Sequence, residues 1–214
     1  MNGADLLHYG LRVALIAVAL FLWFWTQALI ARKTAHRSGL GDAIHDWTAP
    51  LHGWLTAHPR AGDRILMISS GFIDLFGLYL IFASIFGPTL RPFIAMFSLY
   101  ALRQVCQAIC TLPIPPGMIW RRPGFPSLFV TYGTSNDFFF SGHTAIAVLG
   151  ALELAHYGLL PLTIAVAFIA VMEAATVLIL RAHYTLDVLA AACAAWCAAC
   201  FATWAAPCVD VWLK

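Results

Sequence analysis

Long apolar runs, bounded by prolines, glycines or charged residues, are the main feature of the chain. A helix rises ~1.5 Å per residue, so about 20 apolar residues cross the ~30 Å hydrocarbon core of a bilayer. Prolines such as Pro161 and Pro207 mark where successive runs end. The pattern predicts six membrane-spanning helices, at residues 13–31, 65–86, 93–110, 144–160, 162–180 and 188–206.

The sequence shows no internal repeat and no soluble domain. We therefore expect a single domain, residues 1–214, with an all-α polytopic membrane fold. An even number of spans returns both termini to one face of the membrane. The polar segments 31–64, 111–143 and 181–187 then share the opposite face.

Composition agrees with a membrane fold, because 62% of the 214 residues are apolar and only 10% are charged. Too little polar surface exists to cover a water-soluble domain. The net charge of +2 gives no electrostatic reason to bind nucleic acid. We interpret the polar stretch before Arg64 as a loop, with solvated histidines and with Trp47 and Trp54 at the membrane interface.

Four ionisable residues interrupt the predicted spans: Asp74, Arg103, Glu153 and Glu173. Each such group costs about 2.5–3.5 kcal/mol at mid-membrane unless it pairs or meets water. We expect them to form a polar cluster that opens toward the face bearing the polar segments. One interpretation is an ion pair of Arg103 with Asp74 or Glu173 that fixes helix packing; the other is binding of a lipid headgroup.

The first candidate site is the segment 137–144, with the sequence Asp-Phe-Phe-Phe-Ser-Gly-His-Thr. Gly142 lets the backbone approach a ligand closely, and the helix that begins here leaves unpaired N–H groups at its start. These donors and the positive end of the helix dipole suit a phosphate. His143 is then placed to move a proton at that phosphate.

The second candidate site is the segment 181–188, with the sequence Arg-Ala-His-Tyr-Thr-Leu-Asp-Val. A spacing of four places His183 and Asp187 on one helical face. A carboxylate on one ring nitrogen leaves the other free to attack phosphorus, and Arg181 can neutralise phosphoryl oxygens. Because the segments between the two sites cross the membrane and return, both histidines end on one side.

Other interpretations of these histidines stay open at this point. A single histidine near a membrane interface is commonly a packing or snorkelling residue. A pair can also bind haem or a quinone, although a neighbouring arginine suits an anion better. The chain lacks the carboxylate-rich spacing of a Mg²⁺ site, and one imidazole can attack while the other supplies the proton. We therefore expect neither metal nor cofactor.

Three segments together resemble the sphingomyelin synthase branch of the type-2 phosphatidic acid phosphatase (PAP2) superfamily. Residues 91–115 are similar to its Arg…Tyr-x-x-Arg…Thr-x-Leu-Pro-x-Pro element. The other two segments are similar to its Asp-x-x-x-Ser-Gly-His-Thr and His-Tyr-Thr-x-Asp-Val elements. The resemblance covers residues 91–188, which we take as the catalytic segment, and implies a PAP2-like helical bundle core.

The resemblance also implies a reaction, the transfer of a phospholipid headgroup through a phosphohistidine. His183, polarised by Asp187, attacks the phosphodiester, and His143 protonates the departing diacylglycerol. An acceptor such as ceramide or diacylglycerol then takes the phosphoryl headgroup. The implied phosphate- or headgroup-binding residues are Arg181, Ser141, Gly142, Asp137, Arg103, Tyr100, Arg121 and Arg122.

Two alternatives to the transferase remain. One is a lipid phosphatase or phospholipase C-like hydrolase that uses water as acceptor. The other is a non-catalytic lipid-binding membrane protein, and a homo-oligomer is compatible with all three. Lysines and arginines are more numerous on the face of the two histidines, which predicts a cytoplasmic site, whereas the resemblance implies an exoplasmic one. We adopt the exoplasmic orientation as the expectation.

Overall fold

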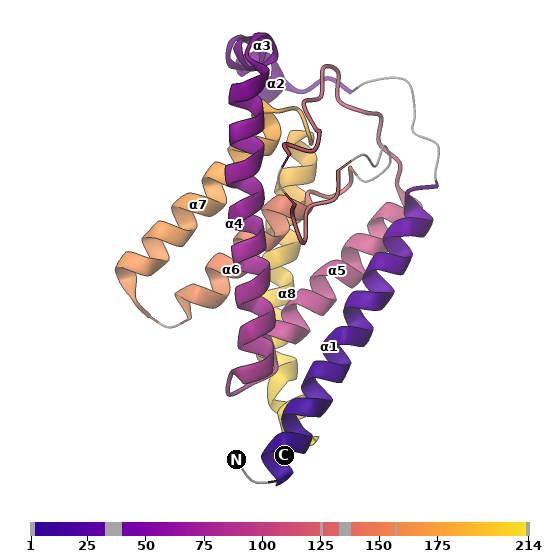
Figure 1. Cartoon of the computed structure of the whole chain (residues 1–214), viewed down its shortest axis with the longest axis vertical. Coiled ribbons are helices and arrows are strands. Elements are labelled where there is room, and N and C mark those ends of the chain that lie inside the picture. Colours follow the sequence, from indigo (N-terminus) through magenta and orange to yellow (C-terminus); the bar gives the residue numbers. More distant parts are fainter. Residues whose placement is uncertain (1–2, 33–39, 125, 133–137, 157, 213–214) are drawn as a thin grey trace.

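The computed structural model describes residues 3–32, 40–124, 126–132, 138–156 and 158–212 (Figure 1). Within these ranges the chain forms helices and no strands. The eight helices are α1 (Gly3–Ile30), α2 (Ala43–Trp47), α3 (Ala49–Ala57), α4 (Pro59–Phe86), α5 (Arg91–Ile109), α6 (Gly142–Ala155), α7 (Leu160–Ile179) and α8 (Thr185–Trp212).

Six of these helices correspond to the six predicted spans. In the described part of the chain, four are long and apolar enough to cross a membrane: α1, α4, α7 and α8. Helix α6 has only 14 residues, and α5 carries two arginines and two glutamines. An all-helical membrane protein is therefore confirmed, whereas the six-span count and the PAP2-like core stay predictions.

Helix α8 lies at the middle of the bundle, with α5 and α6 packed against it (Figure 1). Its buried face consists largely of alanines, which let neighbouring helices approach closely. Pro207 was expected to end this helix, but α8 continues through it to Trp212. Helix α1 leans against α4 and α5 at the edge of the bundle, and α1 begins at the same end of the molecule at which α8 finishes (Figure 1).

The expectation of a polar loop before Arg64 was wrong for the described residues. Asp42 caps α2 by accepting hydrogen bonds from the N–H groups of Ile44 and His45. Pro50 and Pro59 lie in the first turns of α3 and α4, where a proline costs no hydrogen bond. The short helices α2 and α3 therefore cover one end of the bundle (Figure 1).

The three carboxylates predicted inside spans do not form one cluster. Asp74 accepts hydrogen bonds from the N–H groups of Leu128 and Phe129, at 3.0–3.1 Å, and so fixes the loop before α6. Glu173 accepts one from Ser69 at 2.5 Å, and Glu153 pairs with Arg91 at 2.8 Å. Each carboxylate therefore has a separate partner, and its hydrogen bonds or ion pair offset the cost of burying the carboxylate.

Candidate active site

The two predicted sites meet at the start of α6. Ser141 is the N-cap of this helix, and its hydroxyl oxygen accepts hydrogen bonds from the N–H and the hydroxyl of Thr144. The Ser141 N–H donates to the backbone carbonyl of Asp187 at 3.3 Å. One backbone bond therefore joins the segment that holds His143 to the segment that holds His183.

His183 is buried, with 6% of its surface exposed, and its Nδ1 lies 2.8 Å from the carbonyl oxygen of Phe138. A carbonyl only accepts, so Nδ1 carries the hydrogen and Nε2 keeps its lone pair for chemistry. The nearer Asp187 oxygen lies 3.6 Å from Nδ1 and accepts the Tyr184 N–H at 2.9 Å. The direct partner of the ring is thus a carbonyl of the first segment, with the predicted carboxylate just behind it.

The buried ring of His143 has a nitrogen that is available to a ligand. It is 6% exposed, and its Nε2 is buried without a hydrogen-bond partner among the described residues. Trp120 packs edge-on against the ring, with centroids 5.0 Å apart, and its own Nε1 donates to the carbonyl of Thr131. An unpaired buried nitrogen costs about 1–3 kcal/mol, a cost that a bound substrate can remove.

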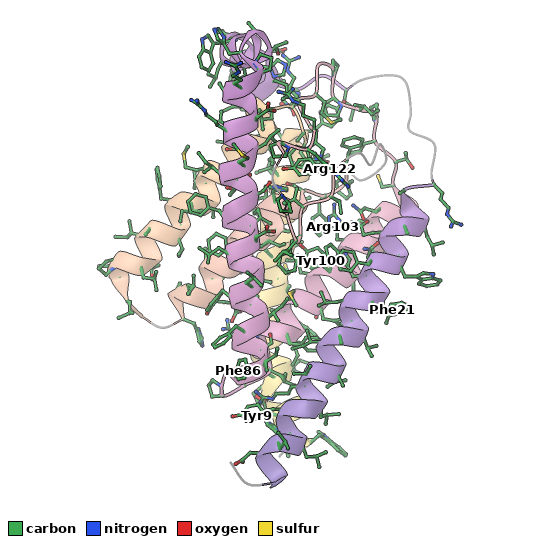
Figure 2. The ribbon with its side chains drawn as sticks, in the orientation of Figure 1. Tyr9, Phe21, Phe86, Tyr100, Arg103 and Arg122 are labelled. Carbon is green, nitrogen blue, oxygen red and sulfur yellow. The ribbon has the colours of Figure 1, made fainter. Side chains whose placement is uncertain are left out.

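Both histidines line one cavity of about 40 Å³, which is enough space for a few water molecules. Tyr100, Arg103 and Gly142 line it as well. Arg103 lies directly beneath Gly142: a Cβ added there would lie 3.5 Å from the guanidinium carbon. The Arg103 Nε donates to the carbonyl of Phe140 at 2.9 Å, which fixes the cation at the start of α6. Figure 2 shows Tyr100 and Arg103 on the inner side of α5.

This geometry suits a phosphate. A guanidinium and the positive end of a helix dipole point at the same small space, and two imidazoles border it. Such an arrangement can supply a nucleophile, a proton donor and a stabiliser of negative charge in one place.

The other predicted binding residues lie elsewhere. The guanidinium of Arg181 donates to the carbonyls of Pro116 and His45, at 3.0 and 3.4 Å, and so ties the loop at Pro116 and helix α2 to the second segment. Arg121 forms an exposed ion pair with Asp63 at 2.8 Å, and Arg122 is exposed. None of these three arginines lines the cavity. Asp137 lies outside the described residues, so its role, like theirs, stays a prediction.

Helix α2 supplies two site residues that sequence reasoning missed. The Asp42 carboxylate accepts hydrogen bonds from the backbone N–H and the hydroxyl of Thr185, at 2.6 and 2.8 Å. The His45 Nε2 lies 2.9 Å from the carbonyl oxygen of His183. Together they hold the start of α8 from outside, so the histidines expected to be solvated include one that is buried against the site.

The electrostatics of Asp42 follow from these bonds. Partial burial alone raises the pKa of its carboxyl, but the hydrogen bonds from Thr185 and the nearby His45 lower the pKa overall below its ordinary value of 3.8. Asp42 is therefore charged at neutral pH. An aspartate is a common N-cap, but the segment was expected to be a loop, and the partner of Asp42, 143 residues away, leaves no local pattern in the sequence.

The fold and the site together define a helical membrane protein in which two buried histidines and an arginine line one small cavity. The chain belongs to the AtPDCT1/2 family, whose model matches residues 42–204. The matched region begins at Asp42 and includes both histidine segments. The family's name refers to phosphatidylcholine:diacylglycerol cholinephosphotransferase. No curated protein and no solved structure matches the chain.

Proposed function

We propose that the protein is a phospholipid headgroup transferase that moves phosphocholine from phosphatidylcholine to diacylglycerol. The observation that carries this proposal is the pair of buried imidazoles on one small cavity, where His143 keeps an unpaired nitrogen and Arg103 supplies positive charge. The name of the family supports choline phosphate as the group transferred and diacylglycerol as the acceptor.

In the first step, Nε2 of His183 attacks the phosphorus of phosphatidylcholine. The bond from phosphorus to the glycerol oxygen breaks, and His143, which is protonated when the negatively charged phosphodiester lies beside it, gives its proton to that oxygen. Diacylglycerol leaves, and phosphocholine stays on His183. The Nδ1 hydrogen bond to Phe138 holds the ring in the reactive tautomer, and the Asp187 carboxylate stabilises the positive charge that develops on it.

In the second step, neutral His143 takes the proton of the diacylglycerol hydroxyl, and the oxygen attacks the phosphorus. The bond from nitrogen to phosphorus breaks, which returns His183 to its starting state and leaves His143 protonated. Arg103 and the N–H groups at the start of α6 stabilise the phosphoryl oxygens in both steps. Protons and charges balance over the cycle, so no metal is needed in it.

Hydrolysis is the second candidate function, because the cavity has room for water molecules beside the two rings. The sphingomyelin synthase-like variant, with ceramide as acceptor, uses the same histidines. It differs only in the lipid alcohol, and the family name favours diacylglycerol over it.

The test is headgroup transfer by purified protein in vesicles of phosphatidylcholine with deuterated choline. Three arms contain diacylglycerol of distinct chain mass, ceramide, or no acceptor, and mass spectrometry follows the label. We expect labelled phosphatidylcholine with the new chains, and no product after His183→Ala. The matched control is His58→Ala, since His58 is an exposed histidine. Label only in free phosphocholine would show a hydrolase, and label in no product from folded protein would contradict both.

A further inference from the structure

A second cavity adjoins the catalytic one. It has a volume of about 300 Å³, in the range of ligand-binding pockets, and lies among α1, α4, α5 and α6. Its walls are almost entirely apolar, with side chains such as Leu20, Met96 and Phe97. Four residues line both cavities: Trp23, Tyr100, Phe129 and Ile146.

Trp23 and Tyr100 form the boundary between the two spaces. Their ring centroids are 5.1 Å apart, and the rings are tilted by 58°. The Trp23 Nε1 is buried without a hydrogen-bond partner in the described part of the chain. The Trp23 and Tyr100 rings therefore belong to the walls of both the polar catalytic space and the apolar chamber.

A polar group inside the apolar chamber indicates what it binds. The side-chain amide of Gln104 lines the chamber, and both its oxygen and its nitrogen are buried without a partner in the described residues. Leaving such a group unpaired costs about 1–3 kcal/mol, so a ligand with one matching polar group is favoured. An ester carbonyl at the head of a hydrocarbon chain fits both the amide and the apolar walls.

The shape of the chamber also suits a chain. Along α5 its lining runs from Phe93 to Gln104, which is ~16 Å at ~1.5 Å per residue. The Gln104 end lies next to Arg103 and hence beside the catalytic cavity, whereas Phe93 lies near the far end of the bundle. A lipid with its phosphoryl group at the histidines can thus extend one tail toward Phe93.

We propose that this chamber binds one acyl chain of the diacylglycerol unit that donor and acceptor share, with the Gln104 amide donating to its ester carbonyl. The inference rests on the proposed function and adds a role for α1. Residues 19–26 of α1 form one wall, and α1 lies outside the region matched by the family. The N-terminal helix therefore sets which acyl chains the protein accepts.

Filling the chamber tests its occupant. Ala19→Phe places a ring in the lining, and Val18→Phe places the same ring on the neighbouring exposed position of α1. With dihexanoylphosphatidylcholine as the donor in both arms, we expect Ala19→Phe to lower transfer to dioleoylglycerol about tenfold, because the free energy of burying roughly two methylene groups is lost. Transfer to dihexanoylglycerol should stay within twofold. Equal losses for both acceptors, or the same loss with Val18→Phe, would overturn the proposal.

Gln104→Leu tests the ester contact. We expect the wild type to prefer ester-linked over ether-linked diacylglycerol, and the variant to lose about two- to tenfold of that preference, as one hydrogen bond provides. An unchanged ratio would contradict the assigned contact.

A binding measurement separates this inference from the proposed function. Phosphatidylcholine with a photoreactive acyl chain is added to His183→Ala protein, which cannot turn over. We expect labelling of peptides from residues 19–26 and 93–104, reduced at least fivefold by Ala19→Phe. Labelling without transfer in the wild type would refute only the transferase. Transfer without labelling of these peptides would refute only the chamber.

Discussion

The two ends of the bundle use the same kinds of side chain in opposite ways. At the end where α4 joins α5, Arg91 pairs directly with Glu153 at 2.8 Å. Asp210, near the end of α8, accepts hydrogen bonds from Thr89 and from the N–H of Leu90, at 2.5 and 2.9 Å. Arg12 of α1 donates to the carbonyl of Gly87 at 2.7 Å. Tyr9 packs against Phe86 at the same end (Figure 2).

At the other end, Arg103 and both imidazoles line a cavity. The Arg103 Nε donates to a backbone carbonyl, and His143 Nε2 has no hydrogen-bond partner among the described residues. A cation that meets a carboxylate directly holds helices together, whereas a buried nitrogen without a partner, such as His143 Nε2, is available to a substrate. The comparison therefore predicts that changes at one end affect stability and changes at the other affect turnover.

The largest effect is expected at the catalytic end. His143→Ala removes the proton donor and acceptor, so we expect kcat to fall by about 10²–10⁴-fold with an unchanged melting temperature. The labelled-choline transfer assay measures the rate, and thermal unfolding in detergent measures stability. A parallel loss of both quantities would break the comparison.

Next comes the ion pair at the opposite end. Arg91→Met leaves the Glu153 carboxylate buried and unpaired, which costs about 3–5 kcal/mol for a buried pair. We expect a lower unfolding temperature in detergent, with the rate per folded molecule within twofold of wild type. Arg91→Met with Glu153→Gln should recover part of the stability. A fall in kcat without loss of stability would place Arg91 in the reaction instead.

The sequence predicted the two histidines and their shared face, because each lies in a short motif at the end of an apolar run. It did not predict Phe138 as the partner of His183, since a contact between segments 45 residues apart has no local pattern. Trp120 and Asp42 were missed for the same reason. The polar stretch before Arg64 was taken as loop because α2 and α3 are too short to show a clear period.

A smaller effect is expected from Asp42, which holds the start of α8 through Thr185. Asp42→Asn removes the charge from the acceptor of the two hydrogen bonds that Thr185 donates. Hydrogen bonds to a charged group contribute about 1.5–3 kcal/mol, so the start of α8 is held less firmly in the variant. We expect kcat to fall about tenfold while KM stays near its wild-type value. Asp46→Asn, an exposed neighbour in α2, is the matched control and should show no change. Equal effects of the two variants would rule out a positioning role.

The dependence of the unfolding temperature on pH also tests the contacts of Asp42. The folded pKa of Asp42 is lower than its ordinary value of 3.8, so its contribution to stability is complete above that value. That contribution is lost as pH falls through the lowered pKa. We expect the unfolding temperature of the wild type to fall below about pH 4 with an additional step that Asp42→Asn lacks. The same acid transition in both proteins would contradict this assignment.

The last prediction concerns only which side of the membrane carries the site, and we expect its variant to have the smallest effect on the protein. Trp47→Cys places a thiol on α2, at the end of the bundle that holds the two histidines. The native Cys208 is exposed near the opposite end of the bundle. With the expected exoplasmic site, an impermeant maleimide labels Trp47→Cys in intact cells and Cys208 only after permeabilisation. The reverse order would assign the site to the cytoplasmic face, as the lysine and arginine count predicts.

The bond between His183 and the Phe138 carbonyl has a consequence for protein engineering. The His183 ring and the backbone carbonyl that selects its tautomer come from different parts of the chain. A chimera that imports only residues 181–188 from a relative would receive the ring without the carbonyl that orients it. The two segments should therefore be exchanged together, as a matched pair.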